Sequence, residues 1–172
     1  MKSLKRPANV VKELVENSID ASSSKIDIII EEGGMNLIQI IDDGSGMDKD
    51  DARLCFQDMQ QVKSIMIKIY FVIQTLGFRG EAIPSVASIS HFVLKTSDGS
   101  QGSTVIYEFG KFIEQKQSDL NRGTNISVSK LFQNVPARLK YVKSVNAEFA
   151  HIQNYVERLS LSHSRYCFYF NT

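Results

Sequence analysis

Glu13 and Asn17 are the first residues whose types and spacing could do chemistry. They are four residues apart in a predicted helix over 7–21, so they project from the same side, next to Asp20. A carboxylate in this position can take a proton from a water molecule, and an amide oxygen can bind a hard cation such as Mg²⁺. A solvated polar face on a helix that ends in Asp is the alternative interpretation of the same residues.

A second candidate group follows a predicted strand over 37–42. Its isoleucines indicate a buried strand and leave Asp42 at the edge of the core, where a carboxylate needs hydrogen-bond donors. The exocyclic amine of a purine would supply one donor. Gly44 and Gly46 would allow a close approach of the backbone or a positive φ. A simple Asp-Gly turn remains an alternative, whereas a calcium loop is excluded because Arg53 occupies its twelfth position, which requires Glu.

Two further motifs could contact phosphate groups. The stretch Gly77-Phe78-Arg79-Gly80-Glu81 opens a predicted helix, and its backbone N–H groups together with the positive helix end could hold a phosphate. Its spacing differs from that of a Walker P-loop. Thr124 follows Arg122 and Gly123 at the start of a predicted strand, where its hydroxyl could contact a phosphate or only close the turn.

The elements that must position these residues are predicted from apolar periodicity and turn residues. We expect helices over 7–21, 48–56, 80–88, 137–143 and 146–162, and strands over 25–32, 37–42, 90–96, 103–109 and 124–129. Gly33-Gly34 is the predicted turn between the first two strands. Strands clustered in hairpins, with helices before and after them, favour an α+β layered sandwich over a doubly wound fold.

Composition sets the class of protein. With 172 residues, 42% apolar and 23% charged, the chain is expected to form one globular domain. A formal net charge of +1 does not indicate nucleic-acid binding, so any contact with DNA must come from a local patch. The two Cys are isolated and the three His lack metal spacing, which argues against a disulfide scaffold and a zinc module. Since neither a transmembrane run nor a signal peptide is evident, we expect a cytoplasmic protein without membrane contact.

The order of these motifs resembles a known family. The matching stretches run from Arg6 to about Phe170 and include RPANVVKELVENSIDA, IIDDGSGM, TLGFRGEAIPSVASIS and RGTNISVSKLFQNVPARLKY. They resemble the N-terminal ATPase domain of MutL-type DNA mismatch repair proteins, which belong to the GHKL superfamily with DNA gyrase B and histidine kinases. GFRGEA and NVPAR are typical of the mismatch-repair branch and argue against a chaperone or kinase-type module. The resemblance implies a two-layer sandwich, with a mixed, mostly antiparallel sheet covered by helices on one face.

The resemblance also implies roles for individual residues, with ATP and Mg²⁺ as the cofactors. Glu13 would be the general base acting on the attacking water, and Asn17 would be the Mg²⁺ ligand. Asp42 would bind the adenine amine, Thr124 would add a polar contact near the base, and the glycines of 42–47 would shape the base site. The residues implied to bind ATP are Asn17, Asp42, Gly44, Gly46, Met47, Gly77, Phe78, Arg79, Gly80, Glu81 and Thr124.

In the family, ATP binding drives homodimerisation and couples recognition by a MutS-type mismatch protein to downstream repair. DNA contact would come mainly from the full-length protein, but Arg138, Lys140 and Lys143, together with Arg122, could form a basic patch here. A nucleotide-binding or inactive remnant without ATPase activity is the alternative function.

The sequence departs from the family pattern in three places. We expect one domain over 1–172, without the second domain that supplies a lysine to the γ-phosphate and without the C-terminal dimerisation domain. The chain opens with Met-Lys-Ser-Leu-Lys where the family has Gly-Glu-Val-Val. Residues 58–72 read DMQQVKSIMIKIYFV, although the family's lid carries His-Ala-Thr-Ser-Lys there. Codons for 58–63, read from the third base, can encode that motif, so our hypothesis is that 58–72 are a frame-shifted lid.

Overall fold

The computed structural model describes residues 4–56, 82–163 and 166–171. The predicted lid segment over 58–72 and the stretch Gly77–Glu81 lie outside these residues. In chain order the elements are α1 (Pro7–Asp20), β1 (Lys25–Glu31), η1 (Glu32–Gly34), β2 (Leu37–Asp42), α2 (Lys49–Leu54), α4 (Ala82–Ala87), β3 (His91–Ser97), β4 (Ser103–Glu108), β5 (Lys111–Gln117), β6 (Gly123–Ser129), α5 (Pro136–Leu139), α6 (Val145–Ser162) and β7 (Cys167–Asn171).

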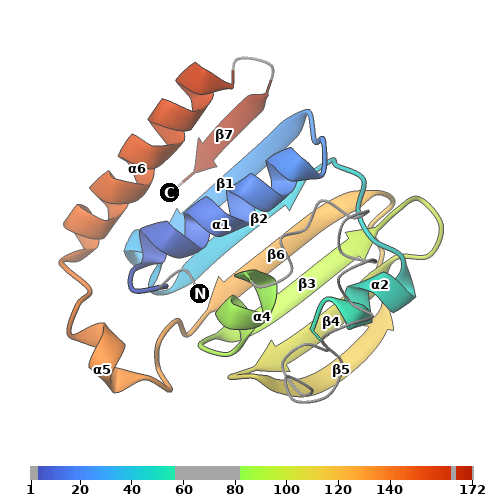
Figure 1. Cartoon of the computed structure of the whole chain (residues 1–172), viewed down its shortest axis with the longest axis horizontal. Coiled ribbons are helices and arrows are strands. Elements are labelled where there is room, and N and C mark those ends of the chain that lie inside the picture. The colour runs from blue at the N-terminus through green and yellow to red at the C-terminus, as the bar shows by residue number, and fades with distance from the viewer. Residues whose placement is uncertain (1–3, 57–81, 164–165, 172) are drawn as a thin grey trace, which may run out of the picture.

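The strands form one seven-stranded sheet in the order β5-β4-β3-β6-β2-β1-β7 (Figure 1). The pairing of β1 with β7 is parallel, and the other five pairings are antiparallel. The sheet is therefore mixed and mostly antiparallel, as predicted.

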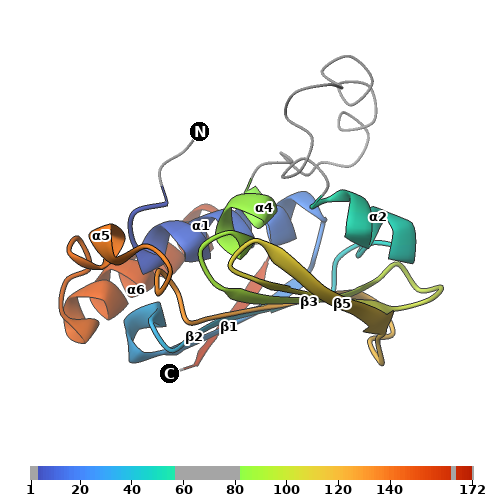
Figure 2. The same ribbon diagram turned by 90° about the horizontal axis from the view of Figure 1, so that it is seen from below.

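The helices lie on one side of this sheet, seen edge-on in Figure 2. Inward-facing apolar residues alternate along the central strands, as Ile26, Ile28 and Ile30 do in β1, because successive side chains of a strand point to opposite faces. These side chains pack against the buried stripe of α1, which includes Val10 and Leu14. The core lies between the two layers, and the predicted α+β sandwich is confirmed. Among the described residues no helix is both long and apolar enough to cross a membrane.

The first helix begins as its sequence predicts. Pro7 occupies the first turn, where its missing N–H leaves no helical hydrogen bond unmade. The helix ends at Asp20, and the N–H of Ala21 still donates to the carbonyl oxygen of Asn17 at 2.9 Å. Glu13 and Asn17 therefore lie on one continuous helix, one turn apart.

The start of α6 is tied to the segment before α1 by a buried ion pair. Nε and Nη2 of Arg6 donate to Oε1 of Glu148 at 3.2 and 2.9 Å, and the backbone N–H of Lys143 donates to the same oxygen at 2.9 Å. The Glu148 side chain is 0% exposed and that of Arg6 27%. This pair joins three segments of the chain at one end of the helical layer.

Several elements differ from the sequence-based predictions. The strands β5 and β7 were not predicted, because β5 lacks inward-facing apolar alternation and β7 is defined by its pairing with the distant strand β1. The helix predicted over 137–143 is a single turn that ends at Leu139, and the predicted helix over 48–56 spans only Lys49–Leu54. The turn at Gly33-Gly34 is part of a short 3₁₀ turn.

Candidate functional site

A row of polar side chains crosses three neighbouring strands on the helix-covered face. In the sheet register Asp42 of β2 pairs with Thr124 of β6, and Thr124 pairs with Thr96 of β3. All three side chains are buried; Asp42 and Thr96 come after the inward-facing apolar residues of their strands, and Thr124 comes before those of the antiparallel β6. The apolar core therefore ends at this row, and the row brings together two of the residues predicted from the sequence.

Asp42 is buried, with 8% of the residue exposed. The hydroxyl of Ser18 donates to its Oδ2 at 2.7 Å, and the backbone N–H of Gly44 donates to its Oδ1 at 3.0 Å. Burial raises the pKa of Asp42, the hydrogen bonds from Ser18 and Gly44 oppose that rise, and the nearby charge of Asp43 adds to it. The prediction that this carboxylate needs donors is confirmed, and here the protein itself supplies them, with the backbone N–H of Thr124 as a further donor.

Ser18 was not among the residues predicted from the sequence. It stands four residues after Leu14, on the buried side of α1 that otherwise carries apolar side chains. A serine within an apolar stripe was the available signal, because a buried hydroxyl requires a partner. The identity of that partner depends on how α1 packs on β2, which is a contact between elements that are not adjacent in sequence.

The loop after β2 packs backbone against backbone on the neighbouring strands. Gly46 has a φ of +64°, and a Cβ there would collide with the carbonyl group of Ser97. The N–H of Met47 donates to Oγ1 of Thr96 at 2.9 Å, and that hydroxyl lies 3.2 Å from the carbonyl oxygen of Gly123. The positive φ predicted for this loop is confirmed at Gly46. The close approach is to the protein's own backbone.

The turn at Asp42–Gly44 also matches the simpler interpretation of the sequence. A hydrogen bond from the N–H of Gly44 to the side chain of Asp42 is the pattern of an Asx turn. The neighbouring Asp43 accepts from the N–H of Ser24 at 2.7 Å and from the N–H of Lys25 at 2.9 Å, which ties the loop to the start of β1. The loop is thus a structured turn, and it presents one buried carboxylate.

The C-terminal half of α1 lies against this loop. The carbonyl oxygen of Ala21 accepts a hydrogen bond from the N–H of Ser45 at 3.0 Å. Asn17, which precedes Ser18, and Glu13, one turn earlier, are half-buried, whereas Asp20 is exposed. Asn17 and Glu13 therefore both lie on the helix whose Ser18 reaches Asp42 of the polar row. The predicted phosphate-binding stretch Gly77–Glu81 lies outside the described residues.

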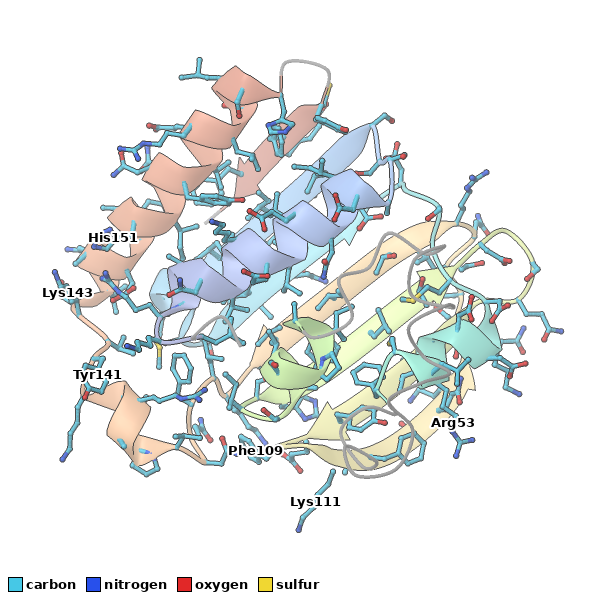
Figure 3. All side chains as sticks on the ribbon, in the orientation of Figure 1. Arg53, Phe109, Lys111, Tyr141, Lys143 and His151 are labelled. Carbon is cyan, nitrogen blue, oxygen red and sulfur yellow. The ribbon has the colours of Figure 1, made fainter. Side chains whose placement is uncertain are left out.

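The basic residues predicted to contact DNA occupy a different part of the molecule. Arg138 is in α5, and Lys140 and the exposed Lys143 follow it before α6; Lys143 is labelled in Figure 3 beside that helix. Arg122 precedes β6, whereas these three follow it, and seven residues of strand span roughly 20 Å. The prediction of one patch that includes Arg122 is therefore wrong, because β6 separates it from the others.

Comparison with known proteins shows the family. Residues 5–140 match the family model described as histidine kinase-, DNA gyrase B-, and HSP90-like ATPase. The chain is 50% identical over 169 residues to the DNA mismatch repair protein MutL of Listeria innocua, covering 98% of this chain and 28% of that protein. It is 47% identical to MutL of Bacillus pumilus over 161 residues, covering 93% of this chain and 25% of that protein. The chain thus spans about a quarter of the length of these relatives.

Solved structures show the same fold. The ADP complex of the Aquifex aeolicus MutL ATPase domain superimposes with a TM-score of 0.75 at 25% identity, covering 98% of this chain and 60% of that one. The topoisomerase IV ATP-binding domain of Francisella tularensis, solved with a small-molecule inhibitor, gives a TM-score of 0.63 at 18% identity, covering 98% and 83%. The similarity to the topoisomerase IV domain concerns the fold alone. By the family match over most of its length, this chain belongs to the histidine kinase-, DNA gyrase B- and HSP90-like ATPases, and within them it resembles the MutL proteins.

Proposed function

We propose that this chain is the ATP-binding and ATP-hydrolysing domain of a MutL-type mismatch repair protein. The observation that carries the proposal is the buried carboxylate of Asp42, held in place by Ser18 and Gly44 beside the helix that bears Glu13 and Asn17. A desolvated, oriented acceptor of this kind suits the exocyclic amine of adenine, because a neutral N–H donor offsets part of the cost of burying the charge.

Recognition of the base would use the polar row. The carboxylate of Asp42 accepts hydrogen bonds from Ser18, Gly44 and the backbone of Thr124, and its two oxygens, with about four acceptor sites, retain capacity for another. Oγ1 of Thr96 accepts from Met47 and lies within reach of the carbonyl oxygen of Gly123 and of Oγ1 of Thr124. If Thr96 gives its proton to the Gly123 carbonyl, Thr124 is the donor in the hydrogen bond between the two hydroxyls, and its Oγ1 keeps lone pairs that would accept from a nucleotide N–H.

Hydrolysis would use the half-buried face of α1. Glu13 would take the proton from the attacking water, and the amide oxygen of Asn17 would hold Mg²⁺. The donor chemistry fits this ion, since Mg²⁺ in nucleotide sites uses few protein oxygens and completes its shell with phosphates and water. When bound, it would neutralise charge on the phosphate oxygens. Gly77, Phe78, Arg79, Gly80 and Glu81 would surround the triphosphate.

Two substitutions separate binding from hydrolysis. Asp42→Asn should abolish tight ATP binding, because the amide lacks the charge and presents a donor to the adenine amine. Glu13→Ala should bind ATP as the wild type does and release no phosphate. Asp119→Asn, the same change at an exposed carboxylate on the β5–β6 connection, is the matched control. It should leave both ATP binding and phosphate release at the wild-type level. Equal ATP affinity of the wild type and Asp42→Asn would remove the assigned adenine contact.

Binding without hydrolysis is the second candidate function, and the sequence of residues 58–72 favours it. This segment lacks the hydroxyl-rich motif of the family's lid, and lid closure excludes water and completes the catalytic site in many phosphate-transferring enzymes. Saturable ATP binding with no phosphate release above that of the Glu13→Ala variant would assign this function. Phosphate release that depends on Glu13 would reject it.

For the longer protein we propose ATP-driven homodimerisation, coupling to a MutS-type mismatch protein, and DNA contact through Arg138, Lys140 and Lys143. These three residues can neutralise backbone phosphates, so DNA retention should fall as salt is raised. Replacing all three by Gln should flatten the salt dependence, whereas Lys111→Gln, on the far edge strand labelled in Figure 3, should leave it unchanged. Absence of DNA retention even at low salt would reject the DNA contact.

A further inference from the structure

Among the described residues, Ser18 makes the one side-chain hydrogen bond to Asp42. Its side chain lies on the buried side of α1, and 3% of the residue is exposed. Its Oγ lies 2.7 Å from Oδ2 of Asp42 and 3.4 Å from the carbonyl oxygen of Leu14. A hydroxyl has one proton, and the shorter distance directs it to the carboxylate.

Together with Gly44, Ser18 fixes the carboxylate at both ends. The N–H of Gly44 holds Oδ1 at 3.0 Å and the hydroxyl of Ser18 holds Oδ2, so rotation of the carboxyl group would break one bond or the other. The two donors arrive from different segments, the loop after β2 and the helix α1. The orientation of Asp42 therefore depends on the packing of α1 over the sheet.

We propose that Ser18 is a positioning residue that sets the preference of this site for a 6-amino purine over a 6-oxo purine, by holding Asp42 as an oriented acceptor. The inference rests on the proposed nucleotide function. An ionised carboxylate has no proton to give, so it accepts from the amine of adenine and repels the oxygen of a 6-oxo purine. Loss of the Ser18 donor removes the hydrogen bond that orients Oδ2 and favours the charged form of Asp42.

The test compares ATP with inosine triphosphate, which carries an oxygen in place of the 6-amino group. Both are titrated calorimetrically with Mg²⁺ into the wild-type chain and into Ser18→Ala, between pH 5 and pH 8. Ser18→Ala should bind ATP about tenfold more weakly, the effect of one hydrogen bond to a charged group. Its ATP-to-inosine triphosphate affinity ratio should fall, and it should fall further as the pH drops, because a protonated Asp42 can donate to the 6-oxo group.

Ser23→Ala is the matched control. Ser23 is also buried beside the end of α1, but its hydroxyl donates to the carbonyl oxygen of Ser18 at 2.6 Å and does not touch Asp42. It should keep the wild-type affinity ratio at every pH. Ser18→Cys, which has similar size and a weaker donor, should give an intermediate ratio, and it tests the proposal should the alanine chain fail to fold.

The results separate this inference from the function on which it rests. If the folded wild type binds ATP but Ser18→Ala keeps the wild-type ratio at every pH, the positioning role is wrong and the nucleotide function stands. If Ser23→Ala lowers the ratio as much as Ser18→Ala, the effect is one of general packing and the role is again wrong. If the folded wild type does not bind ATP, both proposals fall.

Discussion

Removal of Glu148 should lower the free energy of unfolding by about 3 kcal/mol. Its Oε1 accepts three hydrogen bonds, two from Arg6 and one from the backbone N–H of Lys143, and the side chain is fully buried. Truncation of one partner of a buried ion pair typically costs about 3–5 kcal/mol. Arg6 is 27% exposed and can regain water, so Glu148→Ala should lie at the lower end of that range.

Two further variants separate charge from packing. Glu148→Gln keeps the size and one acceptor oxygen for the charged Arg6 but loses the attraction between opposite charges, so we expect a smaller loss, of about 1.5 kcal/mol. Glu157→Ala removes a carboxylate from the exposed side of the same helix and should change the stability by no more than about 0.5 kcal/mol. A double-mutant cycle with Arg6→Ala should give a coupling energy of at least about 1.5 kcal/mol.

The assay is urea unfolding of the whole chain, followed by circular dichroism. The midpoint should shift for Glu148→Ala while the slope of the transition stays the same. A loss equal to that of Glu157→Ala, or no coupling with Arg6, would refute the idea that this ion pair holds the segment before α1 onto α6.

Three other predictions test the site and the two thiols. Asp42→Asn should be more stable to urea than the wild type at pH 7, because burial raises the pKa of Asp42 above its usual 3.8 and the ionised form then opposes folding. This gain should shrink as the pH falls toward 3.8, and a less stable variant at pH 7 would contradict it. Gly46→Ala should cost at least about 2 kcal/mol more than Gly99→Ala, since Gly99 also has a positive φ but open space around it; equal losses would show that the loop can move away. Burial raises the pKa of Cys55 to about 12 while Cys167 is exposed, so one thiol should react with a disulfide reagent at pH 8 in the native chain and two in urea. Two rapidly reacting thiols in the native chain would contradict the burial of Cys55.

The elements with strong periodicity could be predicted from the sequence, and those defined by distant partners could not. The first helix and the hairpin of β1 with β2 have regular apolar spacing and turn residues, and their bounds agree closely with the prediction. The edge strand β5 is exposed almost throughout and is a strand because it pairs with β4. The strand β7 exists through its parallel pairing with β1 after the long helix α6, a contact that local sequence does not specify.

The candidate site divides in the same way. Asp42 could be identified because it ends a buried strand, and Thr124 because it lies at the start of another. Ser18 and Thr96 could not, because their roles depend on which hydroxyls face the carboxylate and the loop once helix and sheet have packed. Gly46 was identified correctly as a position for positive φ, but the neighbour that requires a glycine is the backbone of β3.

Calorimetric titration of Mg²⁺-ATP into the 172-residue chain, with Asp42→Asn beside it, tests the central claim most directly. We expect saturable binding by the wild type and its loss in a variant that remains folded by circular dichroism. Absence of binding by a folded wild-type chain, or equal binding by the two proteins, would contradict the claim that Asp42 lies at the centre of a nucleotide site.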